Sequence, residues 1–309
     1  MACPPRDSTR RRALRAIGGV GVAALSGCLS PTSRSDRCPG SDEGTLDLDD
    51  ATATGVSNEF SSPLDALPHA TRVTVADALE TEPGEATARG YYRPDPRSEF
   101  VVTGPEPRYY RLETTDHDRV RTTGYEYAVE IDADYPVFFD REAVRSFAEL
   151  PAHDRESLRG AIGNAGLIHA PHYTSFSVVF AYEEVGARDR SAFIPGTDTR
   201  YLEWDGVPLR LTFEERRTVA IASTTVAAEL VATSPSEFRE YVGERRGVVL
   251  DSLPTDQREI VERAIDGTYA ECEPYSEPFS DLRKRLSTGG DEAAPLVRYG
   301  GDWYFGHLG

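Results

Sequence analysis

The residues with the clearest chemical potential lie in the stretch 164–200. His169 and His172 flank an alanine and a proline, and two imidazoles in a tight turn can share a metal ion. Two histidines supply only two of the four ligands that such a metal site needs. The proline between them favours a surface turn. The stretch also holds Tyr173, Asp189, Arg190 and Asp198. We therefore take 164–200 as the segment where an enzymatic site would lie, and we assign no catalytic residue, no metal ligand and no cofactor.

Signatures of covalent or phosphoryl-transfer chemistry do not occur in the sequence. There is no Gly-x-Ser-x-Gly turn that would expose a nucleophilic serine. There is also no glycine-rich loop followed by a lysine, because Lys284 is the only lysine and lies among polar residues near the C-terminus. The sequence therefore leans against an enzyme without excluding one.

The first thirty residues have the order of an export signal. Residues 9–15, which include Arg10 and Arg11, resemble a twin-arginine signal, with Ala13 where a large apolar residue is commoner. The apolar run 16–25 is too short to span a bilayer core of roughly 30 Å. Leu25-Ser26-Gly27-Cys28 then resembles a lipobox. These resemblances imply a signal peptide at 1–27 and a lipid on Cys28, whereas the alternative of an uncleaved hydrophobic anchor is disfavoured by the short, glycine-containing run.

The charge balance is strongly acidic and almost free of lysine. The chain has 34 basic and 52 acidic residues and a net charge of −18 at pH 7. Because the signal segment is basic, the rest of the chain is more acidic than the whole. This excess argues against nucleic acid or anionic lipid as the main partner. The composition resembles exported proteins of halophilic archaea, in which surface carboxylates keep a protein soluble in concentrated salt. An acidic mesophile protein from a GC-rich genome is the alternative.

Two cysteines, Cys38 and Cys272, remain once Cys3 is removed with the signal and Cys28 is lipidated. An even pair in an oxidising compartment can form a disulfide. Such a bond would close most of the chain into one loop, with a closure term of roughly 5 kcal/mol in the chain-entropy model. The alternative is two free thiols, because Cys38 lies in polar, flexible sequence.

A sequence motif of sixteen residues occurs three times and divides the chain into repeats. Its copies occupy residues 64–79, 147–162 and 250–265. Apolar residues at three- and four-residue spacing predict an amphipathic helix in each copy. The first helical residue is expected to be Pro68, Pro151 and Pro254. One arginine follows four residues later in each copy, and a structural role is expected for Arg72, Arg155 and Arg258.

A β-hairpin is expected after each of these helices. The predicted turns lie at Gly104, at Asp205-Gly206 and at Gly300-Gly301. Further strands are expected at 124–131 and 218–232, and capped helices are expected after Asp140 and after Ser234 or Ser236. The predicted fold class is α+β, with repeated helix plus β-hairpin units, a largely antiparallel sheet and helices packed on one side.

The expected organisation has five parts. They are a signal peptide at 1–27, a lipidated tether at 28–63, α+β unit 1 at 64–146, α+β unit 2 at 147–249 and a shorter α+β unit 3 at 250–309. The tether is expected from its Ser, Thr, Asp, Gly and Pro content, with Leu46, Leu48 and Val56 able to add one short strand near its end. The body resembles domains of uncharacterised archaeal lipoproteins, a likeness carried by the Leu-Pro helix and the Tyr-Tyr-Arg hairpin.

The function expected from these features is a binding or structural module. The protein is expected to be exported and held by lipid on the outer face of the cytoplasmic membrane, with an unidentified protein, glycan or small molecule as its partner and no nucleic acid. Aromatic pairs such as Tyr91-Tyr92 and Tyr109-Tyr110 can build a binding face, although aromatics are also ordinary strand residues that fill a core. The alternatives are a hydrolase-like extracytoplasmic enzyme with its site in 164–200, and the substrate-binding subunit of a transporter.

The acidic surface leads to a prediction about salt. Because dissolved ions screen the repulsion among carboxylates, we expect the melting temperature to rise between dilute buffer and molar sodium chloride. Thermal unfolding followed by circular dichroism measures this, with sucrose as a control for general solute exclusion. A melting temperature that does not change with salt would contradict the halophilic interpretation.

Overall fold

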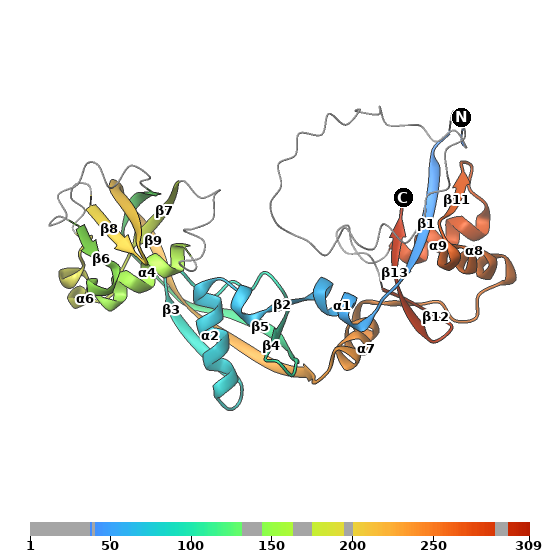
Figure 1. The fold of residues 1–309 in the computed structure, drawn as a ribbon, viewed down its shortest axis with the longest axis horizontal. Coiled ribbons are helices and arrows are strands. Elements are labelled where there is room, and N and C mark those ends of the chain that lie inside the picture. Colours follow the sequence, from blue (N-terminus) through green and yellow to red (C-terminus); the bar gives the residue numbers. More distant parts are fainter. Residues whose placement is uncertain (1–37, 39–40, 132–143, 163–174, 195–199, 288–295) are drawn as a thin grey trace.

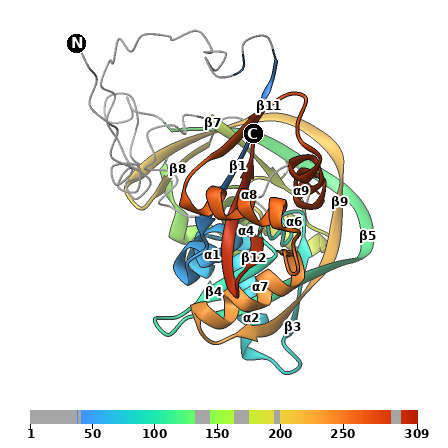
Figure 2. The same cartoon turned by 90° about the vertical axis from the view of Figure 1, so that its right-hand side faces the viewer.

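The computed structural model describes residues 38, 41–131, 144–162, 175–194, 200–287 and 296–309. The described chain is an α+β protein whose sheets are mostly antiparallel. Three lobes lie in a row (Figure 1). Each is numbered by the repeat that supplies its helix, namely residues 69–80 for lobe 1, 152–162 for lobe 2 and 255–266 for lobe 3. Lobe 1 lies in the middle, with lobes 2 and 3 at the two ends. Figure 2 looks along this row from the lobe 3 end.

Lobes 1 and 2 share one eight-stranded sheet, and the five strands in lobe 1 have the order β2-β4-β5-β9-β3, with helix α2 against one face. The pair β2 and β4 is parallel and the other pairs are antiparallel. The elements are β2 (Ser61–Pro63), a 3-10 turn (Leu64–Ala66), α2 (His69–Glu80), β3 (Glu85–Gly90), β4 (Phe100–Thr103), the first half of β5 (Arg108–Ile131) and the second half of β9 (Val207–Ala232).

Lobe 2 repeats this order as β6-β8-β9-β5-β7, again with a parallel first pair and antiparallel pairs after it. It uses the first half of β9 and the second half of β5. Its other elements are β6 (Val144–Ser146), a 3-10 turn (Phe147–Glu149), α4 (Ala152–Ile162), β7 (Ser175–Phe180), α6 (Val185–Arg190) and β8 (Arg200–Trp204).

Lobe 3 has the same order once more, β10-β12-β13-β1-β11, with the first pair parallel. Its elements are β1 (Glu43–Asp50), β10 (Val248–Val249), α8 (Thr255–Asp266), β11 (Tyr269–Cys272), α9 (Glu277–Leu286), β12 (Leu296–Tyr299) and β13 (Asp302–Leu308). Helices α1 (Ala53–Phe60) and α7 (Pro235–Arg246) lie between lobes 1 and 3 (Figure 1).

Each lobe borrows its fourth strand from outside its own repeat. Strands β5 and β9 form one antiparallel ribbon that runs from the pair Tyr109 and Ala232 to the pair Ile131 and Leu209. One half of each strand belongs to lobe 1 and the other half to lobe 2, so the two lobes complete each other. In lobe 3 the same position is filled by β1, which comes from the N-terminal side of the first repeat.

This exchange corrects the expected organisation. The tether predicted for 28–63 is wrong for residues 43–63, where β1, α1 and β2 lie. The short strand expected at Leu46 and Leu48 is confirmed as part of β1, whereas Val56 lies in α1. The strands predicted at 124–131 and 218–232 exist, but each is continuous with the second strand of a hairpin. Unit boundaries at 146 and 249 therefore do not separate the packed lobes, because β5 and β9 cross between them.

The repeated motif forms a helix in all three copies, and each helix begins one residue after the proline that was expected to be its first residue. Pro68 and Pro254 are N-cap residues with extended ψ values of 146° and 155° rather than first helical residues. The proline carbonyl accepts the N–H of the repeated arginine, at 2.8 Å for Arg72, 3.1 Å for Arg155 and 3.0 Å for Arg258.

Two of the repeated arginines also donate side-chain hydrogen bonds to a backbone carbonyl just before the helix begins. Arg155 donates to the carbonyl of Leu150 at 2.5 Å, and Arg258 donates to that of Leu253 at 3.3 Å. Both carbonyls belong to the leucine before the proline. The third copy differs, because Arg72 contacts His69 at 3.3 Å. These contacts are structural, as expected for the arginines.

The hairpins lie where the turn residues predict them. Asp205 and Gly206 have φ values of 49° and 79°, and Gly300 and Gly301 have 61° and 99°, as two-residue hairpin turns require. Ser234 caps α7 by accepting the N–H of Glu237. The helix predicted after Asp140 is wrong for residues 144–146, which form strand β6 in parallel contact with β8. Residues 140–143 lie outside the described chain.

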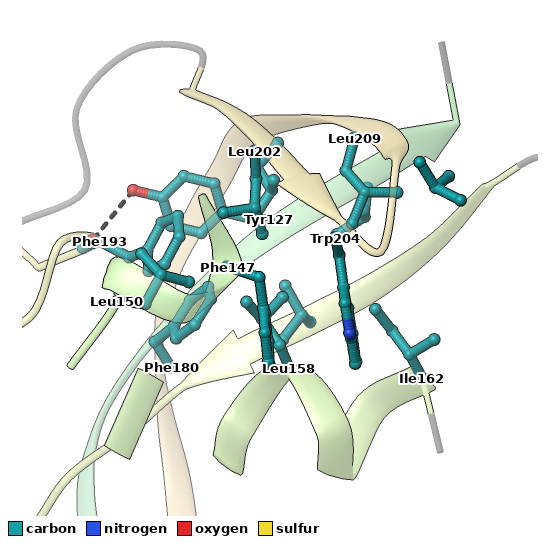
Figure 3. Packing of buried hydrophobic residues seen from close by; sticks show 14 residues of the cluster. Tyr127, Phe147, Leu150, Leu158, Ile162, Phe180, Phe193, Leu202, Trp204 and Leu209 are labelled. Atoms are coloured by element: carbon teal, nitrogen blue, oxygen red, sulfur yellow. Dashed lines mark hydrogen bonds between the residues drawn. The ribbon is translucent and has the colours of Figure 1, made fainter. Parts of the chain in front are cut away.

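The largest core belongs to lobe 2 and packs α4 against the sheet (Figure 3). Phe147 stacks on Trp204 at 4.1 Å between ring centroids, and Phe180 stacks on Phe193 at 4.2 Å. The buried Tyr127 donates its hydroxyl to the Phe193 carbonyl at 2.9 Å. This bond satisfies the one polar atom that the ring brings into the core.

A separate core joins lobes 1 and 3 on the sheet faces opposite α2 and α8. Phe238 of α7 stacks on Tyr109 at 4.2 Å and meets Phe100 edge-on at 5.2 Å. Trp303 of β13 donates its indole N–H to Glu240 at 2.9 Å. Gly243 lies against this indole, and a Cβ there would be 2.5 Å from it. The repeated helices thus cover one face, while α1 and α7 cover the other.

Cys38 and Cys272, the pair offered by the sequence, are joined by a disulfide. Their Cα atoms are 5.4 Å apart. Cys272 ends β11 and lies opposite Glu43, the first residue of β1. The bond therefore fastens the start of β1 to lobe 3.

Replacing Gly243 with alanine tests the contact between lobes 1 and 3. Alanine normally stabilises a helix by up to about 1 kcal/mol relative to glycine. Here the methyl group would collide with Trp303, so we expect a loss of about 1–3 kcal/mol in the free energy of unfolding. Denaturant titration measures it, and exposed Glu244→Ala on the same helix is the control. A Gly243→Ala protein more stable than the parent would contradict the packing.

Candidate functional site

A groove lies where lobes 1 and 2 meet on the β5–β9 ribbon. It consists of two hollows of about 460 Å³ and about 430 Å³ that share one wall, Tyr91. The first hollow is lined by the end of β3, by α4, by the segment after β7 and by α6. The second lies over the middle of β9, beside Arg93, Arg119 and Arg217. Both volumes are of the size that small-molecule sites have.

The Tyr91-Tyr92 segment reaches the groove because β3 pairs with β9 and ends at Gly90. The Tyr92 hydroxyl accepts the N–H of Val179 in lobe 2 at 2.7 Å. Its ring lies against Gly160 of α4, where a Cβ would be 2.6 Å from Tyr92. Burial raises the pKa of the Tyr92 hydroxyl, so it stays neutral. Tyr92 thus holds lobe 1 against lobe 2, while its neighbour Tyr91 lines both hollows.

A fully buried carboxylate supports the floor of the first hollow. Asp154, in the first turn of α4, accepts the hydroxyl of Tyr182 at 2.7 Å, the hydroxyl of Ser191 at 2.7 Å and the N–H of Ala192 at 2.8 Å. Burial, followed by the charge of Asp154, raises the pKa of the Tyr182 hydroxyl. The network therefore holds a neutral tyrosine and pins the segment after α6 to α4.

The position of Asp154 is polar and buried in every repeat. Thr71 and Gln257 occupy the same place in the other two copies of the motif. The Thr71 hydroxyl accepts the N–H of Asp95 at 2.9 Å, much as Asp154 accepts that of Ala192. This shared role in lobes 1 and 2 makes Asp154 a structural carboxylate rather than a catalytic one.

His153 does not form a catalytic triad with its neighbours. Its Nε2 lies 3.7 Å from Asp154 Oδ1, too far for a hydrogen bond, and its ring packs edge-on against Tyr182 at 4.7 Å. The Ser157 hydroxyl donates to the His153 carbonyl at 3.1 Å and lies 3.1 Å from the Tyr182 hydroxyl. Ser157, which lines the groove, therefore donates to a carbonyl oxygen rather than to an imidazole or a carboxylate that could activate it.

Three charged side chains of the first hollow, Arg89, Glu183 and Glu156, are paired. Arg89 donates to Glu183 at 2.7 Å and to the Ser223 hydroxyl at 2.6 Å. The bond to Glu183 raises the pKa of Arg89, and the bond from Arg89 lowers that of Glu183. Glu156 lies between His69 at 3.1 Å and Arg159 at 2.9 Å. Its contact with His69 links α4 to α2 across the two lobes.

The second hollow has the same character. Arg93 and Arg119 both donate to Asp116, which also accepts the Thr224 hydroxyl at 2.8 Å. The Thr224 bond first, and then the two arginines, lower the pKa of Asp116 to about 2. This carboxylate therefore stays charged, and the contact stays formed, at pH values where an ordinary aspartate is protonated.

The residues singled out from the sequence have three outcomes. Asp189 and Arg190 are exposed on α6, beside the groove but not in its wall. Cys38 and Cys272 form the disulfide. The others lie outside the described residues, namely Arg10, Arg11, Cys28, His169, His172, Tyr173 and Asp198. The 164–200 segment does contribute to the groove, but through Tyr182, Glu183, Glu184 and Ala187.

Within the described ranges, no cluster of histidine, cysteine and acidic residues could hold a metal ion. No helix in the same ranges is long and apolar enough to cross a membrane. No family model, no curated protein and no solved structure matches this chain.

The Asp154 network can be tested by removing its carboxylate. In Asp154→Ala, three partly buried donors lose their acceptor, so we expect the free energy of unfolding to fall by on the order of 3 kcal/mol. Denaturant titration measures the change. Exposed Glu156→Ala on the same helix is the control, with an expected loss of at most about 1 kcal/mol. Equal effects of the two substitutions would contradict the structural role of Asp154.

Proposed function

We propose that the protein is an exported lipoprotein, held by a lipid on Cys28 at the outer face of the cytoplasmic membrane, and that its body is a binding module. The observation that carries the binding role is the groove between lobes 1 and 2. Its walls combine tyrosine rings with fixed polar groups, the mixture that binding sites present to a small ligand. Its shape is fixed by Tyr92 and Asp154, both of which are held by hydrogen bonds.

The disulfide supports the extracytoplasmic part of the proposal. Disulfides such as Cys38–Cys272 persist in oxidising compartments and are rare in the cytosol of most organisms. The motifs around Arg10, Arg11 and Cys28 supply the route and the anchor. Acidic composition suits a surface exposed to concentrated salt.

An extracytoplasmic hydrolase is the competing function, and the groove favours it less. A hydrolase needs an activated nucleophile, a metal-bound water or a pair of free acids. In the described part of the groove, the Tyr182 and Ser157 hydroxyls contact each other, and Asp154 already accepts three hydrogen bonds. Binding needs none of these groups to react.

The anchor is tested by replacing the thiol that would receive the lipid. We expect Cys28→Ser to release the protein into the medium or to leave its signal segment uncleaved, because no other residue would attach it. Membrane fractionation followed by mass spectrometry of the N-terminal peptide measures both. Cys3→Ser is the matched control, since that cysteine would be discarded with the signal peptide. Full membrane retention of a processed Cys28→Ser protein would refute the lipid anchor.

A further inference from the structure

The lining of the groove also points to a class of ligand, an inference that rests on the proposed binding function. We propose that the groove binds a short neutral oligosaccharide, with sugar units on both sides of Tyr91. Three features carry this assignment. They are the pairing of the charges in the walls, the planar hydrogen-bonding groups that this pairing leaves exposed, and the position of the Tyr91 ring.

Paired charges make the groove a poor trap for an ion. In the first hollow, Arg89 is neutralised by Glu183, and Glu156 by Arg159. The second hollow is lined by arginines that are also paired with carboxylates. The pairs there are Arg93 and Arg119 with Asp116, and Arg217 with Glu126 at 2.5 Å. Because these charges are already offset by partners, an ionic ligand gains less attraction than it would beside unpaired charges, whereas a neutral ligand loses nothing by the pairing. Glu184 at the rim has no ion-pair partner among the described residues.

Paired carboxylates and guanidinium groups still offer hydrogen bonds. Each carboxylate has about four lone-pair sites and each guanidinium has five N–H donors, so one ion pair leaves several of them free. Both groups are planar and make two parallel bonds to a ligand with adjacent polar atoms. Neighbouring hydroxyls on a sugar ring provide such a pair of atoms, each able to donate and to accept. Arg89, Glu183 and Glu156 expose 38%, 44% and 58% of their side chains for this purpose.

Tyr91 provides an amphipathic surface between the hollows. Its ring packs on a cluster that includes Val219 and Ile221, and it meets Tyr92 edge-on at 5.0 Å, so it is held in place. Its hydroxyl accepts a bond from Arg217 at 3.3 Å, and its own proton has no acceptor among the described residues. An aromatic body with a polar tip suits the C–H face and the hydroxyl edge of a sugar. A ligand that reaches both hollows must pass this ring, so we expect more than one sugar unit.

The test measures binding of defined probes to the purified full chain by isothermal titration calorimetry. The neutral probes are maltotriose, cellotriose, mannotriose and tri-N-acetylchitotriose, each compared with its monosaccharide. Digalacturonate and spermidine are the anionic and cationic probes. We expect at least one neutral trisaccharide to bind at least tenfold more tightly than its monosaccharide, and neither ionic probe to bind more tightly than that trisaccharide.

Substitutions at Tyr91 assign the binding to the groove. We expect Tyr91→Ala to weaken the trisaccharide by more than tenfold, and Tyr91→Phe, which keeps the ring, to weaken it by about threefold to tenfold. Tyr304→Ala replaces a half-buried tyrosine of lobe 3 and should leave the affinity unchanged. Circular dichroism confirms that each variant is folded. If Tyr91→Ala fails to fold, Tyr91→Phe carries the test.

The outcomes separate this inference from the proposed function. If an ionic probe binds most tightly and Tyr91 controls its affinity, the binding role stands and the neutral oligosaccharide is refuted. If a trisaccharide binds equally well to the parent and to folded Tyr91 variants, the groove assignment is overturned. If no probe binds, the inference is overturned and the binding role loses its support, while the lipid anchor is judged separately by the Cys28 experiment.

Discussion

Each of the three described lobes needs a strand that its own repeat does not contain. A repeat provides a short strand, a helix, one further strand and a hairpin, and a second long strand must enter beside the hairpin to complete five. Lobes 1 and 2 meet this need by lending each other half of β5 and half of β9. Neither lobe can bury its helix without the other, because Val226 of β9 packs under α2 and Tyr127 of β5 packs under α4. The two lobes therefore form one folding unit despite being two repeats.

The groove is a product of this exchange. Strand β3 lies on β9 and strand β7 lies on β5, so the segments that follow them, which carry Tyr92 and Tyr182, approach each other over the ribbon. Tyr92 then bonds to lobe 2 and Tyr182 bonds to Asp154 within its own lobe. The two lobes thus differ from each other at their junction, and the asymmetric space between them is the candidate site.

Local features of the fold could be predicted from the sequence, and pairings between distant segments could not. The Leu-Pro helices and the hairpins depend on periodicity and on turn residues such as Asp205-Gly206, which act over a few positions. The alternation of Leu46 and Leu48 with acids allows a short strand at the end of the tether, but nothing nearby in the sequence shows that β11 and β13 lie on either side of it. The strand pattern at 124–131 predicts a strand, but it does not indicate which lobe that strand completes.

The site residues were hidden for the same reason. Tyr91 and Tyr92 stood out as aromatics, but their convergence with Tyr182 depends on contacts across the ribbon. Asp154 could have been found by comparing the repeats, since its position holds a polar, buried residue in all three copies. That signal marks a structural anchor, and it says nothing about a ligand.

The disulfide has a mechanical consequence for a chain held at its N-terminal end. Strand β1 lies between β13 and β11, and tension along it would load the backbone hydrogen bonds on its two sides and the core packing of Leu46 and Leu48. Cys38 precedes the strand, and its covalent partner Cys272 ends the neighbouring β11. For a protein anchored by lipid at Cys28, as proposed, a pull from the membrane reaches Cys272 through the sulfur atoms before it reaches Glu43. The disulfide thus gives the force a covalent path into β11 beside the path along β1, so the strand that completes lobe 3 carries less of the load.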